Sequence, residues 1–498
     1  MFKFLVYFCG IFNLLNGAKA DWVNPVEIKG YKFFDSVTGE SLLIKGVDYY
    51  PRPNFGRLND NSVDFYTHEY RKKWHHDIKE FKKLGINAIR VYSVDPDNDH
   101  SEFMCALNEA GIYALVGLAA AGDFESITNK ETPGCYSRAL KARGERVINE
   151  FARYENTLGF SAGNEVNHFV PLGKRPQWNA PCLKKFVRDM RAYIFSCESI
   201  RNVPVGVVMA DSDRDKNAAY YNCLTNKMDW LESAEWYGLN TYVYCDGAVK
   251  TYKEAVGFRS LVDSFKRYKY SIPVLLTEFG CLSQTFPTID GYAGIRNFNQ
   301  AKFMGSEKEV QEVFAGGFVF EYSTEKSIAR TPYPFKEYGP QNYGLGYMSP
   351  EFCNDIDIPC TFVPIPAFDQ LKAAYGSATE NYVPMNRDDF WVEQDRAPKM
   401  SCPPDFPALT DFDWDPDKYP SLECPSIAKM TYTCPNKILK SPPFVISMSI
   451  LGVIALVLIA KVLVAKFLKG GDKKDKEFSS LLKAENGNGT NYKSTEAK

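Results

Sequence analysis

The sequence predicts an α/β protein whose main domain is a (β/α)8 TIM barrel, followed by a Pro- and Cys-containing strap and a single transmembrane helix. Three observations lead to this prediction. Between residues 41 and 376, apolar runs typical of buried strands alternate with amphipathic stretches typical of helices. Two of these apolar runs end in a glutamate, and a third, long apolar run occupies residues 444–468 near the C-terminal end.

Eight apolar runs are expected to be the strands of the barrel. They are residues 42–50, 87–94, 112–120, 157–165, 203–211, 235–244, 273–280 and 317–324, and the helical stretches between and after them include 69–85, 182–199 and 368–376. Continuous apolar runs indicate strands buried on both faces, and helical crossovers require parallel pairing. Eight such units close into a barrel. The alternative is a doubly wound open sheet, but no Gly-rich phosphate-binding turn follows the first expected strand.

The two ends of the chain carry apolar segments of different kinds. Residues 1–20 combine Lys3, an apolar run and the small residues Ala18 and Ala20, a pattern typical of a secretory signal peptide. An uncleaved anchor is the alternative for this segment. The expected domains are therefore a signal peptide at 1–20, a catalytic barrel at 21–380, a Pro-rich, Cys-bearing strap or linker at 381–443, a transmembrane helix at 444–468 and a cytosolic tail at 469–498.

Lysines around the apolar run at residues 444–468 predict the orientation of the span. Six lysines lie between Lys461 and Lys476, against Lys437 and Lys440 just before the run. The positive-inside rule then places the C-terminal tail in the cytosol. We therefore expect a type I single-pass protein of the plasma membrane with its catalytic domain outside. The tail segment "EFSSLL" (477–482) resembles an acidic dileucine signal, which a sorting adaptor would bind.

Charge and cysteine content exclude some classes of function. The formal net charge is −2, which gives no electrostatic argument for a nucleic-acid partner. Of 13 cysteines, Cys9 leaves with the signal peptide and the other twelve precede the expected span, with no C-x-x-C pair among them. This pattern favours disulfides over zinc. We expect no metal and no cofactor.

Glu165 and Glu278 end two of the expected strands, in "GFSAGNE" and "PVLLTE". The carboxyl ends of barrel strands meet at one mouth, where barrel chemistry occurs, although a single glutamate there is also typical of a rim salt bridge. Two carboxyl groups that face one substrate can cleave a glycosidic bond, one as the acid and the other as the nucleophile. The nucleophile must stay ionised, which requires a cation or hydrogen-bond donors.

Three more strand-end residues fit this chemistry. Arg90 is expected to supply positive charge to Glu278, unless it makes only a structural ion pair. Tyr242 is expected to donate a hydrogen bond to the nucleophile, unless it only packs in the core. Asn164 is placed to hold the 2-hydroxyl of the sugar, an interaction that strengthens in the transition state.

A series of segments carries a family resemblance. In order, "GVDYYP", "LGINAIRVYSVD", "LGFSAGNEVN", "YGLNTYVYC", "LLTEFGC", "FVFEYS" and "NYGLGYM" resemble the β-1,3-glucanosyltransferases of glycoside hydrolase family 72, the wall-remodelling enzymes of fungi, over about residues 25–375. The resemblance implies that Glu165 is the acid/base and Glu278 the nucleophile, and that Cys245 and Cys281 form a disulfide. It also implies that four tyrosines line the sugar subsites: Tyr92, Tyr242, Tyr322 and Tyr343.

The resemblance also implies the reaction. Such enzymes cleave inside a β-1,3-glucan donor, hold the new reducing end as a glycosyl-enzyme and pass it to a second glucan, the acceptor. Two alternatives remain open, an endo-β-1,3-glucanase that only hydrolyses and a catalytically silent glucan-binding receptor. The chain departs from the family at Gly117, where an Asp is usual. The strap contains three cysteines, Cys402, Cys424 and Cys434. Because this number is odd, at least one of them must form a disulfide with a cysteine outside the strap, and we expect its partner to be Cys353 or Cys360.

Overall fold

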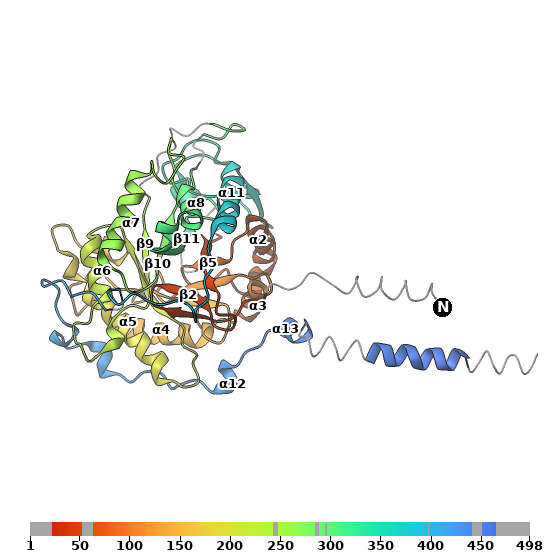
Figure 1. Cartoon of the computed structure of the whole chain (residues 1–498), viewed down its shortest axis with the longest axis horizontal. Coiled ribbons are helices and arrows are strands. Elements are labelled where there is room, and N and C mark those ends of the chain that lie inside the picture. The colour runs from red at the N-terminus through yellow and green to blue at the C-terminus, as the bar shows by residue number, and fades with distance from the viewer. Residues whose placement is uncertain are drawn as a thin grey trace, which may run out of the picture. The chain divides into compact units, whose positions relative to one another are not determined.

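A closed barrel of eight parallel strands forms the centre of the protein (Figure 1), which confirms the predicted fold class. The computed structural model describes residues 22–51, 63–242, 248–283, 288–293, 296–396, 398–440 and 451–464. The chain divides into two compact units, Met1–Tyr432 and Thr433–Lys498, and the barrel belongs to the first.

The barrel strands follow the predicted order along the chain. They are β4 (Ile44–Asp48), β5 (Ala88–Val91), β6 (Tyr113–Gly117), β7 (Thr157–Asn164), β8 (Val205–Ala210), β9 (Tyr237–Asn240), β10 (Val274–Phe279) and β11 (Phe314–Val319). Each strand pairs with its sequence neighbours, and β11 pairs with β4 to close the ring. Because every strand runs in the same direction, the carboxyl ends of all eight lie at one face of the barrel.

Helices cover the outside of the barrel, as Figure 1 shows. The α-helices in the described part of the first unit are α2 (Arg71–Leu84), α3 (Ser101–Glu109), α4 (Arg138–Phe151), α5 (Ala180–Ser196), α6 (Arg214–Asn222), α7 (Val256–Tyr268), α8 (Asn299–Ser306), α9 (Lys308–Gln311), α10 (Lys326–Ala329), α11 (Pro366–Asn381) and α12 (Ile427–Met430). Short 3-10 helices lie at η2 (His68–Tyr70), η3 (Val166–Phe169), η4 (Pro176–Trp178), η5 (Trp230–Glu232), η6 (Leu409–Asp411) and η7 (Asp415–Lys418). Local sequence explains individual ends: the Ser137 hydroxyl accepts from the Leu140 N–H at the start of α4.

Side chains fill the barrel, so it is a packed core and not a pore. Phe318 on β11 lies inside it and is fully buried together with Leu115 and Trp236. Gly46 on β4 makes room for this ring, because a Cβ at that position would lie 2.3 Å from a ring carbon of Phe318. A second, larger apolar layer separates the strands from the surrounding helices.

Two small antiparallel sheets are additions that the sequence analysis did not predict. The strands β1 (Val26–Lys29), β2 (Lys32–Asp35) and β3 (Ser41–Leu42) form a sheet that leads directly into β4. Its Val26 and Phe33 side chains join the apolar cluster inside the barrel. The strands β12 (Gly346–Ser349) and β13 (Thr361–Pro364) form a hairpin before α11.

The strap packs tightly on the barrel up to Tyr432. Its Cys402 bonds to Cys223 after α6, and its Cys424 bonds to Cys197 after α5. We expected a strap cysteine to bond to Cys353 or Cys360. This prediction is wrong, because Cys353 and Cys360 bond to each other. Between the two strap disulfides, the strap makes further contacts with the barrel. Trp414 is buried, and Asp417 forms an ion pair of 2.6 Å with Lys185 of α5.

The second unit contains α13 (Pro435–Lys440) and a helix at residues 451–464 with exposed side chains. Among the helices that the structure describes, none has both the length and the apolar character needed to span a membrane. Three of the segments expected from the sequence lie wholly or partly outside the described residues. They are the signal peptide 1–20, the two ends of the expected span 444–468 and the tail 469–498 with its "EFSSLL" segment.

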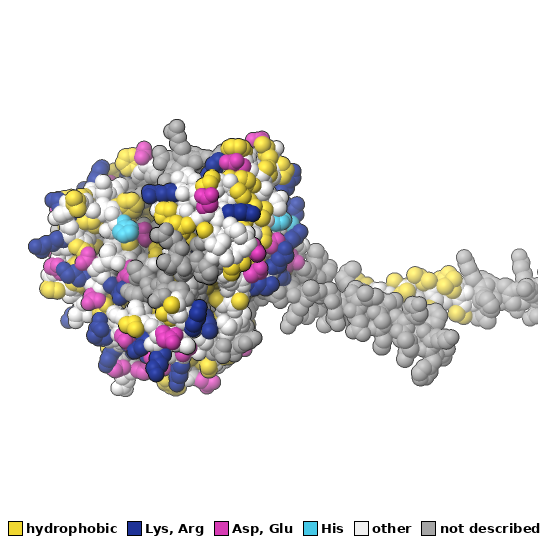
Figure 2. Space-filling model, turned by 90° about the horizontal axis from the view of Figure 1, so that it is seen from above, with side chains coloured by type: hydrophobic (Ala, Val, Ile, Leu, Met, Phe, Trp, Pro, Cys, Tyr) yellow, Lys and Arg dark blue, Asp and Glu magenta, His cyan; other side chains and the backbone are white. Residues whose placement is uncertain are grey.

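On the face of the molecule drawn in Figure 2, basic and acidic side chains are interspersed.

A buried histidine between two carboxylates links α3 to its surroundings. The fully buried His100 lies with Nε2 2.8 Å from Asp64 and Nδ1 3.3 Å from Glu150. Burial alone would lower the pKa of His100, but its hydrogen bonds to Asp64 and Glu150 outweigh burial and raise the pKa to about 9.

This raised pKa predicts a pH-dependent contribution to stability. A folded pKa above the unfolded value of 6.5 stabilises the protein fully below about pH 6.5, and this stabilisation disappears as the pH rises through about 9. His100→Gln should therefore lower the free energy of unfolding by about 3 kcal/mol more near pH 6 than near pH 10. Urea unfolding at both pH values measures this. The exposed His75, changed to Gln, is the control; equal losses at both pH values for His100→Gln would contradict the assignment.

Candidate active site

Glu165 and Glu278 lie at the carboxyl-end face of the barrel, as predicted. Glu278 belongs to β10, and Glu165 follows β7 directly in a left-handed backbone conformation with φ of 50°. Asn240, at the end of β9, donates from Nδ2 to Glu165 Oε1 at 3.1 Å and to Asn164 Oδ1 at 3.1 Å. Arg90 on β5 donates to both Glu278 and Asn164, so one continuous network joins the two glutamates.

Three donors surround the Glu278 carboxylate, which is almost fully buried. Arg90 Nη1 and the Tyr92 hydroxyl donate to Oε1 at 2.9 and 2.8 Å, and the Tyr242 hydroxyl donates to Oε2 at 2.6 Å. Hydrogen bonds to an ionised group are about twice as strong as neutral ones. This environment stabilises a negative charge at Glu278, which is what a nucleophilic carboxylate needs.

Glu165 has the opposite environment. Burial and the negative charge of Glu278 raise the pKa of the Glu165 carboxyl, and the Asn240 hydrogen bond opposes this only in part. Among the Lys, Arg and His side chains that the structure describes, only His168 lies within ion-pair distance of it, with Nδ1 3.2 Å from Oε2 at the exposed edge. A carboxyl group whose pKa is raised beside a second carboxyl group is suited to act as the acid. The predicted division of roles between Glu165 and Glu278 therefore agrees with their surroundings.

Both tyrosines beside Glu278 remain neutral donors. Burial, together with the charge of Glu278, raises the pKa of Tyr242 well above its usual value. Burial likewise raises the pKa of Tyr92 well above its usual value, against the nearby Arg90 charge. The predicted hydrogen bond from Tyr242 and the predicted charge contact from Arg90 are both confirmed.

The Tyr242 hydroxyl is expected to contribute mainly to the rate. Tyr242→Phe removes a hydrogen bond to a charged group, which is worth about 1.5–3 kcal/mol, so kcat should fall about 10- to 100-fold with little change in KM. Steady-state kinetics on a laminari-oligosaccharide donor measure the effect. Tyr419→Phe, at an exposed tyrosine of the strap, is the matched control. A kcat within twofold of the wild type for Tyr242→Phe would show that the hydrogen bond is not used.

Asn164 is oriented by its neighbours. Its Oδ1 accepts from Arg90 Nη2 at 2.7 Å and from Asn240 Nδ2 at 3.1 Å. Because Oδ1 already accepts two hydrogen bonds, the Nδ2 group of this exposed side chain can donate to an oxygen of the substrate. This fits the predicted contact to a sugar hydroxyl.

A cavity of about 510 Å³ opens beside this network. Arg90, Tyr92 and Asn164 form one side of it. Small side chains form much of the rest, namely Gly117, Ala119, Ala120, Ala121, Ser126, Ser161 and Gly163. Gly117 cannot carry a side chain, because a Cβ there would lie 2.3 Å from the backbone oxygen of Tyr92. At the position of the family's usual Asp, the chain therefore packs its backbone directly against that of Tyr92.

Two of the four predicted subsite tyrosines lie against Glu278, and a third lies next to them. Tyr92 and Tyr242 bond to its carboxylate, and the Tyr343 ring lies 5.0 Å from the Tyr242 ring. Phe320, which was not predicted, packs against both Tyr242 and Tyr343, at 6.1 and 5.6 Å between ring centres. These aromatic side chains form one wall beside Glu278.

Tyr322 does not belong to this wall, so its predicted contact with sugar is wrong. Its side chain is fully buried, its ring stacks on Phe362 at 4.2 Å, and its hydroxyl donates to Asp77 of α2 at 2.9 Å. It packs between the barrel and the helix layer. A side chain with no exposed surface cannot contact substrate.

The sequence analysis missed Asn240, which contacts both Asn164 and Glu165. The available signal was its place in "GLN", at the end of a predicted strand, which is the same position that drew attention to Asn164. Cys245 of the predicted bridge to Cys281 lies outside the described residues, although Cys281 is disulfide-bonded. Within the described ranges, no cluster of three His, Cys, Asp or Glu side chains is arranged to hold a metal ion.

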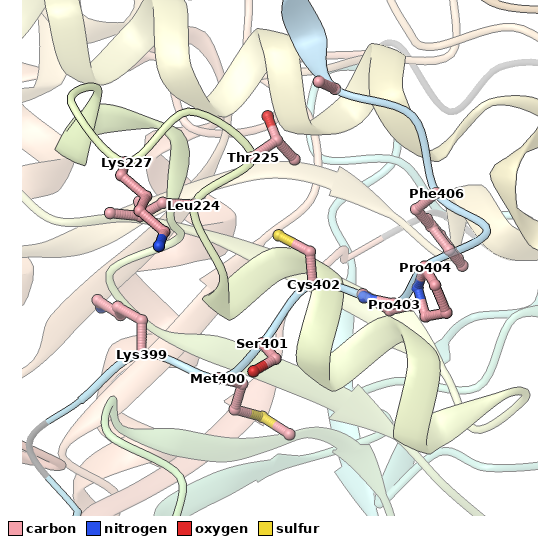
Figure 3. A pocket seen from close by; sticks show the side chains of 11 residues that line it. Leu224, Thr225, Lys227, Lys399, Met400, Ser401, Cys402, Pro403, Pro404 and Phe406 are labelled. Carbon is pink, nitrogen blue, oxygen red and sulfur yellow. The ribbon is translucent and has the colours of Figure 1, made fainter.

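A second cavity, of about 530 Å³, lies where the strap meets the barrel (Figure 3). Its lining comes from Leu224, Thr225 and Lys227 and from the strap at residues 399–404, 406 and 408, next to the bridge from Cys223 to Cys402. The lining includes Lys227 and Lys399 and no acidic side chain. It has no carboxyl pair, so the chemistry argued above belongs to the cleft beside Glu278.

Comparison with known proteins shows the family to which the chain belongs. A family model described as Glucanosyltransferase matches residues 16–329. The chain is 36% identical over 324 residues to 1,3-beta-glucanosyltransferase gas4 of Schizosaccharomyces pombe, covering 65% of this chain and 62% of that protein. It is 32% identical over 357 residues to 1,3-beta-glucanosyltransferase gel1 of Aspergillus fumigatus, covering 71% and 66%.

Solved structures show the same architecture. Saccharomyces cerevisiae Gas2p in complex with laminaritriose and laminaritetraose superposes with a TM-score of 0.56 at 26% identity, covering 76% of this chain and 73% of that chain. The chain thus spans less than two thirds of the length of the fission-yeast relative and about three quarters of the Gas2p chain.

Proposed function

Because the chain belongs to the glucanosyltransferase family, glycoside hydrolase family 72, we propose that it is a retaining β-1,3-glucanosyltransferase. It cleaves a β-1,3-glucan internally and transfers the new reducing end to another glucan chain, which elongates cell-wall glucan. The observation that carries the proposal is the contrast between the two glutamates. Glu278 is held by a guanidinium and two phenols, whereas the pKa of the adjacent Glu165 is raised.

The first half-reaction forms a covalent bond to Glu278. A carboxylate oxygen of Glu278 attacks the anomeric carbon, and the bond from this carbon to the bridging O3 breaks. Glu165 gives its proton to that oxygen, so the leaving glucan departs as a neutral alcohol. Asn164 binds the 2-hydroxyl, and Tyr242 keeps the reacting carboxylate in place.

The second half-reaction reverses these roles with a new partner. The 3-hydroxyl of an acceptor glucan attacks the anomeric carbon, the ester to Glu278 breaks, and Glu165 takes the hydroxyl proton. Transfer exceeds hydrolysis when an acceptor sugar occupies the cleft before water reaches the ester. The aromatic wall of Tyr242, Phe320 and Tyr343 supports such binding, because ring faces suit sugar rings.

Incubation of the protein with reduced laminari-oligosaccharides tests the proposal. Products longer than the donor, resolved by chromatography, are expected for a transferase. Shorter products alone would indicate the endo-β-1,3-glucanase, and no products would indicate a glucan-binding receptor. Either of these last two results would overturn the proposed transfer.

We also propose that the catalytic unit works outside the cell, tethered to the plasma membrane by a single span at residues 444–468. Support comes from the apolar run in the sequence and from the described disulfides, which are typical of an oxidising compartment. A cytosolic tail carrying "EFSSLL" would then be available to a sorting adaptor. Protease treatment of intact wall-less cells should remove the barrel and spare the tail; release of the full chain by alkaline carbonate would exclude a span.

A further inference from the structure

Asp48 is an acidic side chain at the catalytic centre that the proposed mechanism leaves unused. It ends β4 and lies in register with Arg90 on the neighbouring β5. Its side chain is fully buried. Its Oδ1 lies 3.4 Å from Arg90 Nη1, and its Oδ2 has no hydrogen-bond partner in the part of the chain that the structure describes.

One cation therefore faces two buried carboxyl groups. The same nitrogen, Arg90 Nη1, lies 2.9 Å from Glu278 Oε1. A buried charge without compensation costs several kcal/mol, so a site with a single guanidinium holds one negative charge at lower free energy than two. Glu278 is the better place for that charge, because Tyr92 and Tyr242 donate to it and no described donor reaches Asp48 Oδ2.

The titration of the groups around Asp48 agrees with this distribution of charge. Burial raises the pKa of Asp48 well above its usual value, and the charge of Glu278 adds to this shift; the charge of Arg90 and hydrogen bonding with Arg90 and Tyr92 oppose it and do not cancel it. The other titratable groups that face Asp48 are Tyr92 on the β5 side, Tyr242 after β9 and Tyr375 of α11, and burial raises the pKa of all three. These phenols therefore stay neutral and add no charge to the site.

We propose that Asp48 is a positioning residue that carries a proton in the resting enzyme, supporting the Arg90 side chain while leaving its positive charge to Glu278. The inference rests on the proposed function and extends it to a residue that does not touch the reacting atoms. It has a specific consequence. The position needs a planar, neutral side chain of this size, and it does not need a negative charge.

Asparagine and alanine at this position separate shape from charge. Asp48→Asn keeps the planar group and its Oδ1 acceptor, so kcat for glucan elongation should fall only about threefold. Asp48→Ala leaves Arg90 unsupported beside an empty space, so kcat should fall about 30-fold or more while KM changes little. Rescue of the alanine defect by asparagine is the expected result. An asparagine variant that folds and is as slow as the alanine variant would overturn the proposal.

Infrared difference spectra of the full chain test the proton directly, without turnover. Near pH 6, the spectrum of the wild type minus that of Asp48→Asn should show the C=O stretching band of a buried carboxylic acid, because the band of the Glu165 acid is present in both and cancels. In Glu278→Gln, Arg90 is left with Asp48 as its only charged partner, so Asp48 should ionise and its band should vanish. Glu165→Gln is the matched control and should keep the Asp48 band. Absence of the band in the wild type would refute the protonated state even if elongation is normal, whereas a band without elongation would refute only the proposed function.

Discussion

Glu278→Gln should abolish glucan elongation, with a fall in kcat of about 10⁴-fold or more. The amide has almost the same shape as the carboxylate, and the hydroxyl groups of Tyr92 and Tyr242 still surround it. It does not attack the anomeric carbon, so no glycosyl-enzyme forms and both half-reactions stop. Chromatography of reduced laminari-oligosaccharides measures elongation, and mass spectrometry of the intact protein measures the covalent intermediate.

A matched substitution controls for the loss of a carboxylate as such. Glu69→Gln changes an exposed glutamate of η2 that the proposed mechanism does not use, and its kcat should stay within about twofold of the wild type. Circular dichroism and thermal unfolding check that Glu278→Gln folds. If the folded variant still elongates at a rate close to that of the wild type, the nucleophile has been assigned to the wrong residue.

The barrel could be predicted because its strands are simple to detect. All six residues of β8 and of β10 are buried, so these strands appear in the sequence as continuous apolar runs. The ends of the strands then placed Glu165 and Glu278 at one mouth without any knowledge of distances. The small sheet β1–β3 was not predicted, since its strands have only two to four residues, too few to show a periodic pattern.

The direction of side chains beyond a strand end could not be predicted in the same way. Phe320 and Tyr322 both follow β11, which ends at Val319. Phe320 packs against Tyr242 beside Glu278, whereas Tyr322 turns to Asp77 in the helix layer. Side chains alternate between the two faces only while the backbone stays extended. Both residues are aromatic, so residue type alone could not predict which of them lies beside Glu278 and which lies in the core.

The sequence also does not predict which cysteines form disulfides or which carboxyl groups face the same cation. Two strap cysteines, Cys402 and Cys424, pair with positions about 180 and 230 residues earlier, and spacing alone leaves many connectivities open. Asp48 lies 42 residues before Arg90 in sequence and 3.4 Å from it in space. Only the pairing of β4 with β5 reveals that one guanidinium serves two carboxyl groups.

Glu165→Gln should lower elongation from natural glucans about 10³- to 10⁴-fold, because the leaving glucan then departs without a proton. A donor with a good leaving group removes that requirement. With a laminaribiosyl β-fluoride, the first half-reaction should return, since fluoride departs without an acid. The second half-reaction should stay slow, since Glu165 is also the base that activates the acceptor. The glycosyl-enzyme should therefore accumulate on Glu278 and appear as added mass on the intact protein.

The two glutamate variants should differ in this experiment, and the difference follows from their surroundings. Glu278→Gln should show no added mass with the fluoride donor, because its defect precedes bond cleavage. Azide, which needs no base, should release the sugar from Glu165→Gln as a β-glycosyl azide. The β configuration follows from two successive inversions at the anomeric carbon. Added mass on Glu278→Gln but not on Glu165→Gln would reverse the two roles, and it would mean that the three donors around Glu278 hold the acid and not the nucleophile.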